Sequence, residues 1–290
     1  MMKKKWKPVV ASALAVVIAV CPMSLTASAS NKEAETAESA ETVKNTSPTL
    51  ASIVNISSGA IRGYNYNGTY TYKGIPYATA ERFGMPQKPE PWEGVRSTLV
   101  YGSVSPQNPA YKKSPDSSRF SEYASSDLFE NEADCLNLNV WTQTLDNEAK
   151  KPVVVWLHGG GYSSGASSEL AVYDGTNISQ KGDLVFVSVN HRLNVLGYMD
   201  LSAYGEEYNG SGNAGMADIV AALQWVQDNI ETFGGDPSNV TVIGQSGGGG
   251  KVMTLLGMPS AEGLFQKAWA MSGGVNGRTS EEAQAQTQAV

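Results

Sequence analysis

The sequence predicts an α/β fold in which a mostly parallel sheet is flanked by helices. Three apolar runs rich in β-branched residues predict buried parallel strands, because helices cover both faces of such strands. They are residues 153–157, 184–189 and 240–243. Between the last two runs, four apolar residues recur at spacings of 4, 3 and 4, as on one face of a helix. They are Ile219, Leu223, Val226 and Ile230. Strands that alternate with helices in this way favour one α/β domain.

Weaker patterns precede these elements. Residues 60–64 and 69–75 indicate a small antiparallel start to the sheet. Leu136, Leu138 and Val140 alternate with two asparagines, which predicts a strand with one polar face.

Three further elements are expected after residue 246. They are a helix near 251–256, a strand near 267–271 and a helix from about residue 280. Thr279 and Glu282 have the spacing of a capping box at the start of the last helix. No helix-stop signal follows before Val290.

Residues 244–248 read Gly-Gln-Ser-Gly-Gly and directly follow the apolar run 240–243. A G-x-S-x-G sequence between a strand and a helix is the nucleophile elbow of α/β-hydrolases. The turn is so tight that the serine has a strained backbone, and glycine two positions to either side avoids a collision. About 0.1 chance matches to this short pattern are expected in a chain of this length, so a glycine-rich turn is the alternative. Ser246 is the candidate nucleophile.

A second glycine loop, His-Gly-Gly-Gly at 158–161, directly follows the predicted strand 153–157. Attack of a serine on an ester creates a negative oxygen, and preorganised backbone N–H groups stabilise it. An HGGG loop has this role in lipases and esterases, together with the N–H of the residue after the nucleophile, here Gly247. A flexible loop is the alternative. Two such loops, each after an apolar strand and in the order of the motif, favour an ester-hydrolysing site.

Several further segments agree with one known family in order and spacing. They are residues 72–78, 82–83, 91–96, 134–141, 158–161, 189–193, 212–218 and 222–248. Through these segments the chain resembles the type B carboxylesterases, which include para-nitrobenzyl esterases and, more distantly, cholinesterases. The likeness covers about residues 50–274. It implies an α/β-hydrolase fold and hydrolysis of small-molecule esters, with no metal and no organic cofactor.

The resemblance also assigns the site residues. It implies that Ser246 is the nucleophile and that the N–H groups of Gly160, Gly161 and Gly247 form the oxyanion hole. The family often has Glu and Ala beside the serine, whereas this chain has Gln245 and Gly247. The glutamine keeps its hydrogen-bonding capacity without the charge, and the glycine is expected to make the oxyanion N–H more flexible. We interpret both as subfamily differences.

The triad acid and histidine that should follow the nucleophile are absent from this sequence. In this fold they come after the serine, but His158 and His191 both precede it. We expect His158 to shape the oxyanion loop and His191 to be a structural or surface residue. Glu281 and Glu282 are better explained by helix capping. We therefore expect an α/β-hydrolase fold truncated after the nucleophile elbow and the following strand, the first part of an esterase of roughly twice this length.

The N-terminus has the three features of a secretion signal. Lysines at positions 3, 4, 5 and 7 precede an apolar run at 9–20, and Ala-Ser-Ala at 27–29 forms a cleavage site. The run is short for a bilayer span, so no stable membrane span is expected. A lipid anchor at Cys21 is the less favoured alternative, because Val20 suits a lipobox poorly. We assign 1–29 to the signal, 30–48 to a disordered linker and 49–290 to the esterase domain.

Charge and motifs exclude other classes of site. The net charge of −7 becomes more negative once the four signal lysines are removed, which disfavours nucleic-acid binding. The Gly-Lys pair at 250–251 lacks the glycine and the Ser or Thr of a phosphate-binding loop. The Cys and His residues form no convincing metal-binding cluster.

Cys135 is the remaining cysteine if the signal is removed. In the related esterases this cysteine usually pairs with one in an earlier segment, where this chain has Ser105. We therefore predict that Cys135 is a free, buried thiol.

The sequence thus predicts a secreted serine carboxylesterase, or the first part of one, that forms an acyl-serine intermediate. The chain alone is expected to be nearly inactive without the triad base. Two alternatives remain open: a non-catalytic relative used for binding or adhesion, and an inactive gene fragment. A fluorophosphonate probe would separate a catalytic protein from a binding protein.

Overall fold

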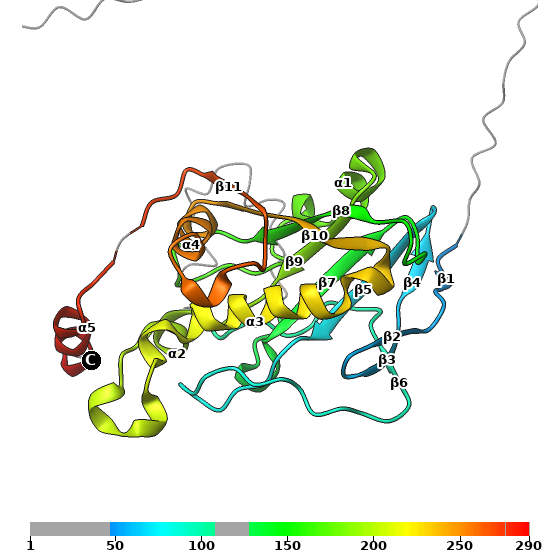
Figure 1. The fold of residues 1–290 in the computed structure, drawn as a ribbon. Helices are drawn as coiled ribbons and strands as arrows, with labels where there is room; N and C mark the ends of the chain where they lie inside the picture. Colours follow the sequence, from blue (N-terminus) through cyan, green and yellow to red (C-terminus); the bar gives the residue numbers. More distant parts are fainter. Residues whose placement is uncertain (1–46, 108–127, 276, 290) are drawn as a thin grey trace, which may run out of the picture. The chain divides into compact units, whose positions relative to one another are not determined.

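The computed structural model describes residues 47–107, 128–275 and 277–289. The assigned secretion signal with Cys21 lies outside these ranges, as does nearly all of the assigned linker. In the described part of the chain, one sheet has eight strands in the order β1-β4-β5-β7-β9-β8-β10-β11 (Figure 1). They are β1 (Thr49–Leu50), β4 (Tyr64–Tyr66), β5 (Thr69–Pro76), β7 (Asn137–Thr142), β9 (Val185–Val189), β8 (Lys151–Leu157), β10 (Gly235–Gln245) and β11 (Lys267–Met271). A smaller sheet contains β2 (Val54–Ile56), β3 (Gly59–Arg62) and β6 (Val95–Ser97).

The large sheet has an antiparallel and a parallel part. In the sheet order, β1, β4, β5 and β7 each pair antiparallel with the next strand, which for β7 is β9. The neighbours β9, β8, β10 and β11 pair parallel. In the parallel part, Leu157 at the end of β8 pairs with Val189 of β9 and with Gly244 of β10. The loops that follow β8 and β10 therefore leave the sheet at the same edge, and this brings the two glycine motifs together.

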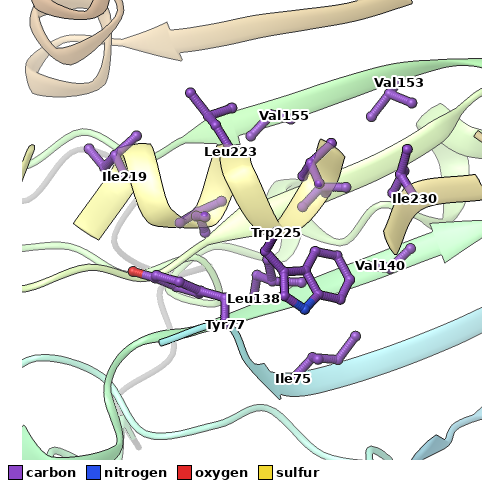
Figure 2. Close-up of a cluster of buried hydrophobic side chains, with 14 of the residues drawn as sticks. Ile75, Tyr77, Leu138, Val140, Val153, Val155, Ile219, Leu223, Trp225 and Ile230 are labelled. Carbon is purple, nitrogen blue, oxygen red and sulfur yellow. The ribbon is translucent and has the colours of Figure 1, made fainter. Parts of the chain in front are cut away.

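Helices cover both faces of the sheet. On one face lie α3 (Ala214–Asn229) and α4 (Gly247–Leu255), and the buried side chains of α3 pack on those of the central strands (Figure 2). On the other face α1 (Thr176–Gly182) approaches Trp141 and Phe186, which alternate with the core residues of their strands. The remaining α-helices are α2 (Asn194–Tyr198) and α5 (Ser280–Gln288). No helix within the described residues is long and apolar enough to cross a membrane.

Short 3₁₀ helices complete the regular structure of the described residues. They are Glu132–Asp134, Ala171–Tyr173, Ser202–Tyr204, Glu206–Tyr208, Ser211–Asn213, Ile230–Phe233 and Pro259–Ala261.

The long elements agree with the sequence prediction, but several boundaries differ. The run 60–64 is divided between β3 in the small sheet and β4 in the large sheet, and β10 extends beyond the predicted run 240–243 at both ends. The four periodic apolar residues are fully buried along α3 and the turn after it. The predicted capping box is present at the start of α5, where Thr279 accepts from the amide of Glu282. The helix expected near Lys251 instead begins at Gly247. Tertiary contacts override the low helix propensity of four successive glycines.

The polar face predicted for β7 is buried. Asn137 and Asn139 are 1% and 0% exposed. Their burial is tolerated because their side-chain amides make hydrogen bonds inside the protein. The Asn139 amide donates to the hydroxyls of Ser167 and Ser188, both at 3.0 Å, and its oxygen accepts from the amide of Gly74. This network satisfies the polar groups on the inner side of the strand.

Cys135 is a buried, free thiol, as predicted. Burial raises the pKa of this thiol to about 12, so it stays protonated and unreactive at neutral pH. Ser105, which the resemblance placed opposite Cys135, accepts a hydrogen bond from the amide of Leu193 at 3.0 Å.

Candidate active site

Ser246 lies at the turn that joins β10 to α4. Its backbone has φ 56° and ψ −123°, a conformation that is strained for a residue with a side chain. Its amide donates to the carbonyl of Met271 at 2.8 Å, and its carbonyl accepts from the amide of Gly250 at 3.0 Å. The side chain is exposed. The turn therefore presents the hydroxyl to solvent, as a nucleophile elbow requires.

The glycines on either side of this turn are required by close backbone approach. A Cβ atom on Gly244 would lie 2.5 Å from the carbonyl carbon of Gly248. A Cβ atom on Gly248 would lie 2.0 Å from the carbonyl oxygen of Leu157, at the end of β8. The first turn of α4 thus packs directly on the sheet edge.

We expect Gly248→Ala to lower the melting temperature, because the new methyl group meets a backbone oxygen that has no room to move. Overpacking of this kind costs about 1–3 kcal/mol, and backbone shifts add to it. Gly277→Ala is the matched control, since nothing lies within 4 Å of that position. Equal melting temperatures for the two variants would refute the packing described for α4.

The glycines of the predicted oxyanion loop lie beside the turn that carries Ser246. A Cβ atom on Gly159 would lie 3.5 Å from the Cβ of Ser246. A Cβ atom on Gly247 would lie 2.5 Å from the amide nitrogen of Gly161. The structure therefore brings Gly161 and Gly247 together next to Ser246.

This close approach gives a physical reason for glycine at position 247. The sequence suggested a looser oxyanion N–H, but the space that an alanine methyl would need is filled by Gly161. Gly160 has φ +87° and lies in a tight turn, where its carbonyl accepts from the amides of Ser163 and Ser164. The loop is thus folded tightly against the elbow.

The two histidines are buried behind this loop. His158 and His191 stack with ring centroids 4.8 Å apart and are each 1% exposed. Burial, followed by the positive charge of Lys251, lowers the pKa of both rings well below the usual value. Both rings are therefore neutral at pH 7. Nδ1 of His158 lies 2.9 Å from the carbonyl of Gly159, which fits the expected role in shaping the loop.

Lys251 lies buried beside the elbow and the glycine loop, a position that the sequence did not predict. It is 0% exposed on α4, and its ammonium donates to the carbonyl of His158 at 3.1 Å. Burial lowers the pKa of this ammonium to about 7, although the Glu169 carboxylate acts to raise it. Burial raises the pKa of Glu169 to about 7. The helix was expected to start near residue 251, so the position of this side chain beneath the elbow could not be predicted from the sequence.

The low pKa of Lys251 predicts how stability depends on pH. Between about pH 7 and 10.5 the unfolded chain binds a proton at Lys251 that the folded chain does not, so stability rises with pH across this window. Below pH 7 both states are protonated, and the full cost of burying the charge is present. Relative to Lys251→Met, the wild type should become more stable as pH rises from about 7 to 10, as measured by urea unfolding. If the difference in the free energy of unfolding between the two proteins did not change with pH, Lys251 would have an ordinary pKa.

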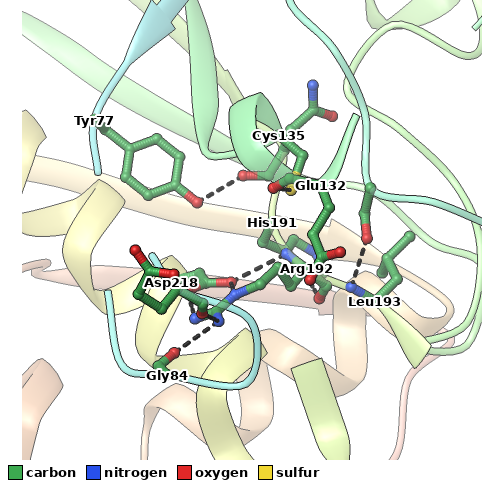
Figure 3. Close-up of polar contacts among 11 residues, drawn as sticks. Tyr77, Gly84, Glu132, Cys135, His191, Arg192, Leu193 and Asp218 are labelled. Carbon is green, nitrogen blue, oxygen red and sulfur yellow. Dashed lines mark hydrogen bonds and ion pairs between the residues drawn. The ribbon is translucent and has the colours of Figure 1, made fainter. Parts of the chain in front are cut away.

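A buried ion pair fixes the segment between β9 and α2 (Figure 3). Arg192 donates to both carboxylate oxygens of Asp218 on α3, from Nη2 at 2.6 Å and from Nε at 2.8 Å. Its Nη1 donates to the carbonyl of Gly84 at 2.7 Å, and its backbone amide also donates to Asp218. Neighbouring His191 is thereby held under the oxyanion loop.

The acidic residues considered as triad candidates lie at a helix start. The Glu282 carboxylate accepts from the amide of Thr279 at 2.9 Å, as capping predicts. Within the described residues, no group of three or more His, Cys, Asp or Glu side chains is placed to hold a metal ion.

Comparison with known proteins identifies the family and the fold. A model of the Carboxylesterase family matches residues 50–290. The para-nitrobenzyl esterase of Bacillus subtilis (strain 168) is 42% identical over 236 residues, which cover 80% of this chain and 45% of that protein. Human carboxylesterase 3 is 40% identical over 207 residues, covering 70% of this chain and 34% of that protein.

A solved structure shares the fold. It is an esterase from anaerobic Clostridium hathewayi that can hydrolyze aliphatic aromatic polyesters, with a TM-score of 0.71 and 50% identity. The match covers 77% of this chain and 44% of that one. The chain therefore spans less than half the length of these relatives. With an α/β-hydrolase fold and the family match over residues 50–290, the chain belongs to the carboxylesterase family.

Proposed function

We propose that this chain supplies the nucleophile and the oxyanion hole of a serine carboxylesterase that acts on small-molecule esters. The observation that carries the proposal is the strained, exposed Ser246 beside Gly161 and Gly247. Strain at a turn persists where the surrounding structure fixes it and is concentrated at functional sites. Membership of the carboxylesterase family supports the same reaction.

In the proposed reaction, the Ser246 hydroxyl oxygen attacks the ester carbonyl carbon and transfers its proton to a general base. The negative oxygen is stabilised by the N–H groups of Gly160, Gly161 and Gly247. The alcohol then leaves with the proton held by the base, and water releases the acid from the acyl-serine.

The base is proposed to be a histidine, oriented by an acid, in the complete protein. The printed sequence has no histidine after Ser246, and both described histidines are neutral and buried away from solvent. The relatives named above are more than twice as long as the segment that they share with this chain, which supports a triad completed by residues outside it.

The N-terminal assignments are part of the proposal. We propose that residues 1–29 direct export and are removed, that 30–48 form a linker, and that the esterase domain starts at 49. The sequence features of the first 29 residues support this. Mass analysis of the exported protein should find its N-terminus near residue 30, and an intact Met1 outside the cell would contradict it.

Covalent labelling tests the proposed nucleophile. The complete gene product should react with a fluorophosphonate probe, and peptide mapping should place the phosphonyl group on Ser246. Heat-denatured protein and the exposed-site variant Ser260→Ala are the controls: the first should not react and the second should react normally. A folded protein without label or esterase turnover would instead be a non-catalytic member of the family.

A further inference from the structure

Lys251 has a burial that the fold alone does not explain. Its side chain is 0% exposed, whereas lysine is almost never fully buried unless it is paired. A methionine of similar length would fill the same space without the cost of removing a charge from water. The position of the ammonium group is therefore the feature that calls for a function.

The ammonium contacts both ends of the oxyanion loop. Its Nζ donates to the carbonyl of His158 at 3.1 Å, immediately before the three glycines. It also lies 5.3 Å from the ring centroid of Tyr162, immediately after them, within range of a cation–π interaction. Lys251 lies five residues after Ser246 on the helix that starts at the elbow. It thus joins the loop to the unit that carries the nucleophile.

The loop needs support of this kind. Residues 159–161 have no side chains to fix their conformation, and Tyr162 has a positive φ of 72°. On the facing side, the first turn of α4 is also glycine. A displacement of about 1 Å in a catalytic group can cost about 10²-fold in rate. A side chain that bridges the loop and α4 can therefore hold these two glycine-rich segments in register.

The positive charge of Lys251 also acts electrostatically on the loop. After burial, Lys251 is the next largest cause of the low pKa of His158 and His191. A positive potential at this position favours a developing oxyanion.

We propose that Lys251 is a positioning residue for the oxyanion hole, holding residues 158–162 against the helix that begins at the nucleophile. This inference rests on the proposed function of Ser246. The residue acts through the Gly160 and Gly161 amides and does not itself touch the substrate.

Lys251→Met in the complete gene product tests the proposal, with para-nitrophenyl butyrate as substrate. We expect kcat to fall about 10²-fold, as for the loss of an oxyanion donor, while KM changes less than about twofold. A trifluoromethyl ketone forms an adduct that places an oxyanion in the hole. Its inhibition constant should rise by the same factor by which kcat falls. Lys181→Met, at an exposed lysine, should leave all three quantities unchanged.

The pH dependence separates positioning from simple packing. Glu169, His158, His191 and the Tyr162 ring surround the ammonium. Burial keeps both histidines neutral, whereas the pKa values of Lys251 and Glu169 are both about 7. The ratio of wild-type to Lys251→Met kcat should fall as pH rises from about 6 to 9, because the wild type loses the charge. The titration of a triad histidine affects kcat of both proteins equally, so it cancels in this ratio.

The outcomes distinguish this inference from the proposed function. A wild type that is neither labelled nor active contradicts the proposed function itself. An active wild type whose Lys251→Met variant matches Lys181→Met overturns only the positioning role. Should Lys251→Met not fold, Glu169→Gln is the second variant, since it removes the carboxylate that raises the pKa of Lys251. It should move the alkaline decline of kcat to lower pH, and an unmoved decline would overturn the proposal.

Discussion

Replacing Ser246 by alanine is expected to lower kcat of the complete protein by about 10⁶-fold, the size of loss found when a serine hydrolase loses its nucleophile. The reason is that no covalent intermediate can form, while the oxyanion N–H groups and the binding surface remain. The loss should appear in kcat with little change in KM, because the hydroxyl acts in the reaction step. Initial rates with a para-nitrophenyl ester measure it.

The matched control is Ser260→Ala, which removes an exposed hydroxyl in the short 3₁₀ helix after α4. It should keep the wild-type rate. Both variants should unfold at the wild-type temperature, because neither hydroxyl is buried. A Ser246→Ala protein that retains more than about one per cent of the activity would assign catalysis to another residue.

Replacing Asp218 by alanine should destabilise the fold by about 3–5 kcal/mol, because the change leaves the Arg192 guanidinium buried without a counter-charge. The side chains of Arg192 and Asp218 are 2% and 0% exposed. The substitution should also disturb the proposed active site, since Arg192 adjoins His191 beneath the oxyanion loop. Urea unfolding measures the stability of each variant.

Asp228→Ala provides the matched control for this pair. Asp228 also lies on α3, but its partner Lys88 is 78% exposed, and such surface pairs contribute about 0–1 kcal/mol. Changing both members of the buried pair, Arg192→Met with Asp218→Leu, should recover much of the loss, because no charge is then left unpaired. Equal losses for Asp218→Ala and Asp228→Ala would contradict the role given to the buried pair.

The sequence predicted the elements whose own residues determine them. The runs that became β8, β9 and β10 are apolar because β9 is buried on both faces and β8 and β10 are buried on one face and half-buried on the other, and this signal is local. The periodic face of α3 and the capping box of α5 are equally local. Those predictions agree with the structure.

The sequence did not predict the features that depend on contacts between distant segments. The first turn of α4 is all glycine, and its close approach to Leu157 and Gly161 explains why Gly247 and Gly248 have no side chain. The buried environment of Lys251 depends on this same turn, so its pairing with His158 could not be expected. The buried polar side of β7 was recognised as polar, but its burial depends on partners more than 25 residues away, such as Ser167 and Ser188.

The most direct test of the proposed site is a crystal structure of the complete protein with a trifluoromethyl ketone bound. The ketone carbon should be bonded to the Ser246 oxygen. The ketone oxygen should lie about 2.7–3.1 Å from the amide nitrogens of Gly160, Gly161 and Gly247. An adduct on another residue, or a ketone oxygen that points away from these glycines, would contradict the site described for this chain.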